Sequence, residues 1–162
     1  MVRHAGLIPA RGRVLDLACG SGRHSKVLAG QGYAVLAVDR NFEAILKLRE
    51  VPGVTTLAAD LEGEEWPLAG ELFAGIVVTN YLWRLRLPDV LAMLAPGGVL
   101  IYETFMLGNE AYGKPSSPAF LLRPGELREV AQAAGLREIA FEEGYTANPK
   151  PAMRQAICAI RD

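Results

Sequence analysis

The residues best suited to chemistry lie in one short stretch, where a carboxylate precedes closely spaced small residues. Asp16 stands in a short apolar run that leads into Ala18, Gly20 and Gly22. The run predicts a buried strand and residues 23–30 predict a helix, so the backbone N–H groups at the helix start are free to bind an anionic or polar ligand group. The glycines would let that ligand approach the main chain closely. Asp16 at the mouth of this loop would repel a pyrophosphate and attract a cationic amino group.

Two more carboxylates stand where predicted strands end. Asp39 follows Gly22 by 17 positions, a place from which an acidic residue can accept hydrogen bonds from both hydroxyls of a ribose. NAD-binding folds use the same device, so Asp39 favours an adenosine ligand without choosing between cofactors. A solvated carboxylate, or a cap for the helix that begins at Phe42, would also explain Asp39. Asp60 ends the third predicted strand, where the plainest interpretation is an exposed loop acid.

Alternating strands and helices must position these residues, and such alternation implies a parallel sheet with right-handed crossovers. Near-continuous apolar residues over 33–39 indicate a strand buried on both faces. The connection over 146–154 is too short for a crossover helix, so the last two strands should be antiparallel. We predict an α/β fold in a single domain over 1–162, with a seven-stranded, mostly parallel sheet, an antiparallel C-terminal hairpin and helices on both faces. The expected strands are 14–17, 33–39, 54–60, 73–80, 99–105, 136–145 and 155–161, and the expected helices are 23–30, 42–50, a short one within 81–94, and 124–134.

The stretch Asp16-Leu-Ala-Cys-Gly-Ser-Gly22 resembles the glycine-rich first motif of class I S-adenosylmethionine-dependent methyltransferases, which runs acidic–x–small–x–Gly–x–Gly. Asp39, Asp60 and Ala95-Pro-Gly-Gly98 stand at the spacings of that class. The chain is most similar to small stand-alone bacterial methyltransferases of the tellurite-resistance type, whose Cys-Gly-x-Gly-Arg pattern matches Cys19 to Arg23. The resemblance implies a Rossmann-like fold, S-adenosyl-L-methionine as cofactor, and methyl transfer as the activity.

The resemblance also implies a cofactor site along the ends of four strands. Asp39 would accept from the ribose, and Asp60 would meet the adenine amino group beside the backbone of Leu61. The end of the fourth strand would lie by the methionine part of the cofactor. The implied cofactor-binding residues are Asp16, Ala18, Cys19, Gly20, Gly22, Asp39, Arg40, Asp60, Leu61, Asn80 and Tyr81.

No catalytic residue is assigned, because a sulfonium methyl group is already activated and the protein mainly aligns the reactants. Trp83 is a candidate for an aromatic wall around the sulfonium, or packs under the following loop. Glu103 and Tyr112 are acid–base candidates on the substrate side. His24 is more simply structural than catalytic.

The long irregular segment 106–123 is expected to cover the acceptor pocket. A loop of this length in a compact domain is usually functional or disordered. Gly108 and Gly113 would act as hinges, while Met106, Tyr112 and Phe120 would shield the transfer from water. A surface connection without ligand contact is the alternative.

The amino-acid composition limits the classes of partner that the chain is expected to bind. With 17 basic and 18 acidic residues the net charge is −1, so no global field recruits nucleic acid or an anionic membrane, and we expect a small-molecule substrate. Cys19 and Cys158 have no metal-ligand spacing and predict reduced thiols in a cytoplasmic protein. Residues 1–11 are too short for the helices that the resemblance places before the first strand, and carry no signal peptide or membrane span. An NAD(P)-dependent oxidoreductase and a cofactor-binding protein without turnover stay open as alternatives, as does the oligomeric state.

Overall fold

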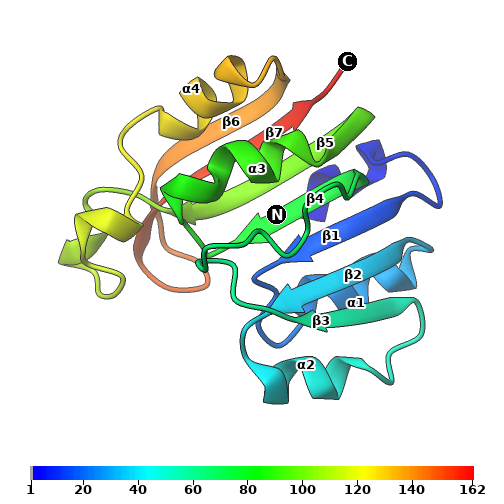
Figure 1. The fold of residues 1–162 in the computed structure, drawn as a ribbon. Helices are drawn as coiled ribbons and strands as arrows, with labels where there is room; N and C mark the ends of the chain where they lie inside the picture. The colour runs from blue at the N-terminus through cyan, green and yellow to red at the C-terminus, as the bar shows by residue number, and fades with distance from the viewer. Residues whose placement is uncertain (1) are drawn as a thin grey trace.

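The computed structural model describes residues 2–162, and Met1 lies outside the described residues. Its strands form one sheet in the order β3-β2-β1-β4-β5-β7-β6 (Figure 1). β1 pairs in parallel with β2 and β4, β2 with β3, and β4 with β5, whereas β7 runs antiparallel to both β5 and β6. The predicted seven-stranded sheet with an antiparallel C-terminal hairpin is therefore confirmed. The strands are β1 (Arg13–Leu17), β2 (Ala34–Asp39), β3 (Val54–Ala58), β4 (Phe73–Thr79), β5 (Leu94–Phe105), β6 (Arg137–Thr146) and β7 (Ala152–Ile160).

Helices pack on both faces of the sheet, as predicted (Figure 1). Successive residues of β1 point to opposite faces, so Val14 packs in the cluster that contains Leu28 of α1, and Leu15 packs in the cluster that contains Leu91 of α3. Both strand residues are fully buried, which is the burial that a parallel sheet covered on two sides requires. None of the described helices is long and apolar enough to cross a membrane. The α-helices are α1 (Arg23–Gly30), α2 (Phe42–Leu48), α3 (Leu87–Ala92) and α4 (Glu126–Ala133).

The N-terminal segment forms a short 3₁₀ helix, η1 (Val2–Leu7), instead of a full helix. The hydroxyl of Tyr33 donates to the carbonyls of Ala5 and Ile8, at 2.9 and 3.1 Å. Ile8 fills the space above Gly75, where a Cβ would lie 2.7 Å from the Ile8 Cδ1 atom. This segment thus seals the face of the sheet against which α1 packs.

Element boundaries differ from the sequence predictions by a few residues, and most clearly at β5. We expected Ala95-Pro-Gly-Gly98 to stop the chain before a strand at 99, whereas β5 begins at Leu94 and runs through this stretch. The register against β4 shifts here, with Gly97 in the left-handed region at φ 77°. The turn residues therefore make a bulge inside the strand and do not end it. Similarly, α2 ends at Leu48, α4 begins at Glu126 and β7 begins at Ala152.

Candidate active site

A cavity of about 310 Å³ opens at the carboxyl ends of the parallel strands. Ligands in open α/β sheets bind outside these strand ends. Loops that follow β1, β2, β3 and β4 meet the end of β5 here, and the segment 106–123 contributes a further wall. The lining residues are Ala18, Asp39, Arg40, Ala59, Asp60, Leu61, Glu62, Asn80, Tyr81, Leu82, Thr104, Phe105, Pro115 and Phe120. Seven of them were predicted as cofactor contacts, and the structure brings these seven together: Ala18, Asp39, Arg40, Asp60, Leu61, Asn80 and Tyr81.

The loop after β1 turns sharply through left-handed backbone. Ala18 has φ 55° and Gly20 has φ 57°. A Cβ built on Gly20 would meet no atom within 4 Å, so this glycine leaves open space beside the main chain. The backbone N–H of Gly20 donates to Asp39 Oδ2 at 2.9 Å, and the N–H of Cys19 donates to the carbonyl of Val38 at 2.9 Å. These bonds fix the loop against the end of β2 and keep the space beside Gly20 free.

Gly22 has another role than the one expected from the sequence. A Cβ at this position would lie 2.4 Å from Leu48 Cδ2 and 2.5 Å from Leu48 Cδ1. The missing side chain therefore makes room for the end of α2, and not for a ligand. The physical reason for this role is helix packing, because α1 begins immediately after Gly22 and the fully buried Leu48 of α2 lies beside Gly22.

Asp16 lies beneath the loop and not at its mouth. Its side chain is 2% exposed and accepts a hydrogen bond of 2.6 Å from the Ser25 hydroxyl. Burial raises the pKa of the Asp16 carboxyl to about 6, and the hydrogen bonds from Ser25 offset this only in part. The reason for the burial is the register, because Asp16 pairs with Ala37 of β2 and Val77 of β4 in the middle of the sheet. Asp16 and the loop residues Cys19, Gly20 and Gly22 are not among those that line the cavity.

Cys19 is part-buried at the top of this loop. Burial, together with the negative charges of Asp16 and Asp39, raises the pKa of its thiol to about 12. The thiol is therefore neutral and unreactive at ordinary pH.

Asp39 presents a carboxylate to the cavity while the backbone holds it in place. Oδ2 accepts from Gly20, and Oδ1 accepts from the N–H of Asn41 at 2.9 Å. Asn41, not Asp39, caps α2, because its side chain accepts from the N–H of Ala44. The capping alternative for Asp39 therefore does not hold, and each of its oxygens keeps a lone pair for a further donor.

Asp60 and Leu61 lie on the neighbouring wall. Asp60 Oδ1 accepts from the N–H of Glu62 at 2.9 Å, which fixes the turn that follows β3, while Leu61 is 5% exposed. Tyr81 also lines the cavity, and its hydroxyl is buried without a hydrogen-bond partner among the described residues. Burial and the carboxylates of Glu62 and Asp60 raise the pKa of Tyr81 to about 12, so the phenol stays neutral.

The end of β4 joins a polar network that reaches β7. Asn80, at φ 57°, donates its backbone N–H to the carbonyl of Glu103 at 2.9 Å. Arg154 donates to Asn80 Oδ1 at 2.6 Å and to Glu103 Oε1 at 2.8 Å, and its guanidinium lies over the ring of Phe105. Glu103 is therefore occupied by an ion pair beside the cavity and does not line it. No local sequence signal pointed to Arg154, since it comes from a strand 74 positions beyond Asn80.

The other predicted substrate residues also lie outside the cavity lining. Trp83 is not among the lining residues, and Tyr112 packs its ring against Tyr145 with the centroids 5.4 Å apart. Within segment 106–123 only Phe120, of the three expected shields, reaches the cavity, together with Pro115. Tyr112 points away because its neighbour is β6.

His24 and the expected hinge Gly108 have structural surroundings. Burial lowers the pKa of His24, and the positive charge of Arg23 lowers it further, so the imidazole is neutral. Gly108, at φ 103°, lies against Met153, and a Cβ on it would come within 3.1 Å of that side chain.

Comparisons with known proteins agree on the fold. A family described as a methyltransferase domain matches residues 14–98. No curated protein sequence matches the chain. TehB from Haemophilus influenzae superimposes with a TM-score of 0.79 at 23% identity, over 99% of this chain and 61% of that chain. A TehB-like SAM-dependent methyltransferase from Corynebacterium glutamicum gives 0.68 at 20% identity, over 98% of this chain and 84% of that one.

A third structure carries ligands. The 1,6-didemethyltoxoflavin-N1-methyltransferase of Burkholderia thailandensis, with bound 1,6-didemethyltoxoflavin and S-adenosylhomocysteine, superimposes with a TM-score of 0.70 at 22% identity, over 99% of this chain and 75% of that chain. At these identities the likeness shows the fold alone, and this chain spans less than two thirds of the TehB chain.

Proposed function

Because the chain belongs to the methyltransferase domain family, we propose that it transfers the methyl group of S-adenosyl-L-methionine to a small-molecule nucleophile. The observation that carries this proposal is the cavity itself. Its lining includes the carboxylates Asp39 and Asp60, which stand at the end of β2 and just after β3, and the apolar residues Phe105, Pro115 and Phe120, which come from β5 and segment 106–123. A polar half suited to adenosine thus adjoins an apolar half suited to an acceptor.

The residues present fit the cofactor. Open space beside Gly20 gives the cofactor's amino-acid part access to the main chain, and Asp39 has lone pairs for two ribose hydroxyls. Asp60 would accept from the adenine amino group, with Leu61 beside the ring. When bound, S-adenosyl-L-methionine supplies a methyl group already activated by its sulfonium.

Chemistry on the protein side then reduces to binding, alignment and exclusion of water. Holding two reactants in line lowers the activation barrier by an amount on the order of 7–11 kcal/mol, without any proton transfer. This agrees with the surroundings of the acid–base candidates, since Glu103 is paired with Arg154 and Tyr112 lies against Tyr145. Phe105 and Phe120 offer aromatic faces, which attract a sulfonium and exclude water from it.

A small, flat acceptor suits this cavity. The cavity of about 310 Å³ would have to hold both cofactor and acceptor, and the part that we assign to the acceptor is aromatic. The Burkholderia methyltransferase binds the small molecule 1,6-didemethyltoxoflavin on the same fold. With a net charge of −1 the chain offers no general field for nucleic acid. Two free thiols, Cys19 and Cys158, support action in the cytoplasm, and nothing in the fold or the family match favours an NAD(P)-dependent oxidoreductase.

Isotope transfer tests this proposal. The protein is incubated with S-adenosyl-L-methionine labelled on its methyl group and with a cell extract separated into small molecules, protein and nucleic acid. We expect label to move only into the small-molecule fraction, and Asp39→Ala to slow the transfer at least tenfold when S-adenosyl-L-methionine is limiting. Label in the protein or nucleic-acid fraction would contradict the small-molecule acceptor.

A further inference from the structure

Two arginines of one 3₁₀ turn bind two different segments beside the cavity. The turn, η2 (Arg84–Arg86), begins four residues after Asn80. Arg86 donates to the carbonyls of Gly63 and Glu64, at 2.8 and 2.7 Å, in the loop that follows the cofactor-side residues Asp60 and Leu61. Arg84 turns the other way, toward the segment 106–123.

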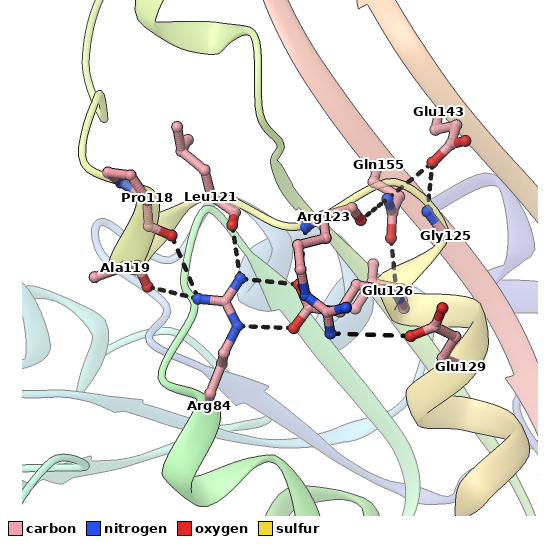
Figure 2. A network of polar contacts seen from close by, with 11 residues as sticks. Arg84, Pro118, Ala119, Leu121, Arg123, Gly125, Glu126, Glu129, Glu143 and Gln155 are labelled. Carbon is pink, nitrogen blue, oxygen red and sulfur yellow. Dashed lines mark hydrogen bonds and ion pairs between the residues drawn. The ribbon is translucent and has the colours of Figure 1, made fainter.

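Arg84 uses its whole guanidinium on that side (Figure 2). Nε and Nη2 hold both oxygens of Glu126, at 2.7 and 2.8 Å. Nη2 also donates to the carbonyl of Leu121 at 2.7 Å, and Nη1 donates to those of Ala119 and Pro118, at 3.1 and 3.4 Å. These five hydrogen bonds match the five N–H groups of an arginine, and a lysine cannot reproduce the fork.

The three carbonyls surround the one aromatic residue of this segment that lines the cavity. They belong to or adjoin the 3₁₀ turn η4 (Pro118–Phe120), and the side chain of Phe120 forms part of the acceptor wall. Leu121 is buried and anchors the segment from below, whereas Phe120 itself is 42% exposed. Its position over the cavity is therefore set by main-chain contacts, of which Arg84 makes three.

The buried partner makes the arrangement rigid. Glu126 is 3% exposed and accepts, besides Arg84, the backbone N–H of Arg123 at 2.8 Å. A carboxylate buried to this degree needs its cation, because an unpaired buried charge is strongly unfavourable. Glu126 begins α4, so Arg84 is held between a fixed helix and the wall of the cavity.

We propose that Arg84 is a positioning residue, which holds Phe120 in the acceptor wall and has no contact with the cofactor. This rests on the proposed function, since it takes the Phe105–Phe120 side of the cavity as the acceptor side. The two arginines of η2 then have different roles: Arg84 holds the segment on the acceptor side, and Arg86 holds the loop that follows the residues assigned to adenosine.

Arg84→Lys tests the proposal, with Arg86→Lys as the matched control on the same turn. Arg84→Lys keeps a cation beside Glu126 and removes most of the contacts to the carbonyls. Hydrogen exchange follows residues 116–122, where the N–H groups of Phe120 and Leu121 donate to Ser117 and Pro118. Fluorine NMR of 4-fluorophenylalanine-labelled protein, assigned with Phe120→Leu, follows the ring directly, and calorimetry measures the Kd of S-adenosylhomocysteine.

For Arg84→Lys we expect at least tenfold faster exchange in 116–122, a Phe120 resonance moved toward that of the free amino acid, and a Kd within twofold of the wild type. Arg86→Lys should leave 116–122 and the Phe120 resonance unchanged and should speed exchange in 61–66. An unchanged Phe120 resonance in Arg84→Lys, or the same response in both variants, would overturn the proposal.

A second variant covers the case in which Arg84→Lys does not fold. Arg84→Met with Glu126→Gln removes both charges and so leaves no unpaired carboxylate at position 126. The same exchange and fluorine signals are expected from it. If the wild type fails to bind S-adenosylhomocysteine, the proposed function fails, while the exchange and fluorine comparison of the ligand-free proteins still decides the role of Arg84.

Discussion

Two glycines of the loop after β1 should respond differently to the same substitution, one mainly in stability and the other mainly in cofactor affinity. Gly22→Ala places a methyl group 2.4–2.5 Å from the Leu48 side-chain carbons, at a φ of 81°. Left-handed backbone costs an alanine ~1–2 kcal/mol, and overfilling a packed site costs ~1–3 kcal/mol. We therefore expect the free energy of unfolding to fall by ~2–5 kcal/mol.

Gly20→Ala has the backbone cost without the clash. Its φ is 57° and its Cβ direction is empty, so unfolding should become easier by only ~1–2 kcal/mol. Its methyl group occupies the space that we assign to the cofactor, so affinity for S-adenosylhomocysteine should drop. The folded fraction of Gly22→Ala should keep the wild-type affinity for S-adenosylhomocysteine. Urea unfolding followed by circular dichroism gives the stabilities, and calorimetry gives the affinities.

A double-mutant cycle makes this reasoning refutable. Leu48→Ala empties the space that the Gly22→Ala methyl group would enter. In the double variant the overlap term disappears, and the loss of stability should be smaller than the sum of the single losses by ~1–3 kcal/mol. Additive losses would refute the clash at Gly22. An unchanged affinity in Gly20→Ala would refute the open approach at Gly20.

Two further predictions concern titratable groups of the same loop. The pKa of Asp16 is about 6 in the folded protein against an ordinary 3.8, so the folded state binds this proton more tightly than the unfolded state does. The stability that protonated Asp16 contributes is complete below pH about 3.8 and is lost as the pH rises through about 6. Asp16→Asn should therefore raise the free energy of unfolding at pH 7 by up to about 3 kcal/mol and flatten its pH dependence between pH 4 and 6. Urea titrations at pH 7 that show a less stable variant would contradict the burial argument. Burial raises the pKa of Cys19 to about 12 and that of Cys158 to about 11, so both thiols are neutral at pH 8. Iodoacetamide should therefore label neither thiol of the folded protein within the time that labels the urea-unfolded chain. Rapid labelling of Cys19 in the folded state, detected by mass spectrometry, would count against a neutral thiol.

The sheet and the carboxylates that line its cavity relate to local sequence signals. Short apolar runs mark strands buried on both faces, and the carboxyl ends of parallel strands meet at one edge. Asp39 and Asp60 each end such a run. The spacing of Asp39 from Gly22 indicated a ligand contact, whereas a ligand contact for Asp60 was implied by the family resemblance, and both residues line the cavity.

Contacts made through the main chain and through distant strands left no such signal. Arg84 binds three carbonyls, and a carbonyl is the same in every residue type. Arg154 meets Asn80 only because β7 inserts beside β5. The packing role of Gly22 depends on where α2 ends against α1, which residue spacing does not fix.

The part of the cavity that segment 106–123 lines was predicted in outline only. Segment 106–123 was expected to cover the pocket, and its residues Pro115 and Phe120 do line the cavity. The choice of Tyr112 followed from its residue type, whereas its direction is set by contact with Tyr145 of β6. Side-chain direction in an irregular segment depends on neighbours that the sequence does not place.

Calorimetry with S-adenosylhomocysteine and NAD, on the wild type and on Asp39→Ala, tests the central claim most directly. We expect the wild type to bind S-adenosylhomocysteine and not NAD. Asp39→Ala should lose at least tenfold in affinity, because a hydrogen bond to a charged acceptor contributes ~1.5–3 kcal/mol and tenfold corresponds to about 1.4 kcal/mol. Binding of NAD without binding of S-adenosylhomocysteine, or equal affinity of Asp39→Ala and the wild type, would contradict the assignment of this cavity.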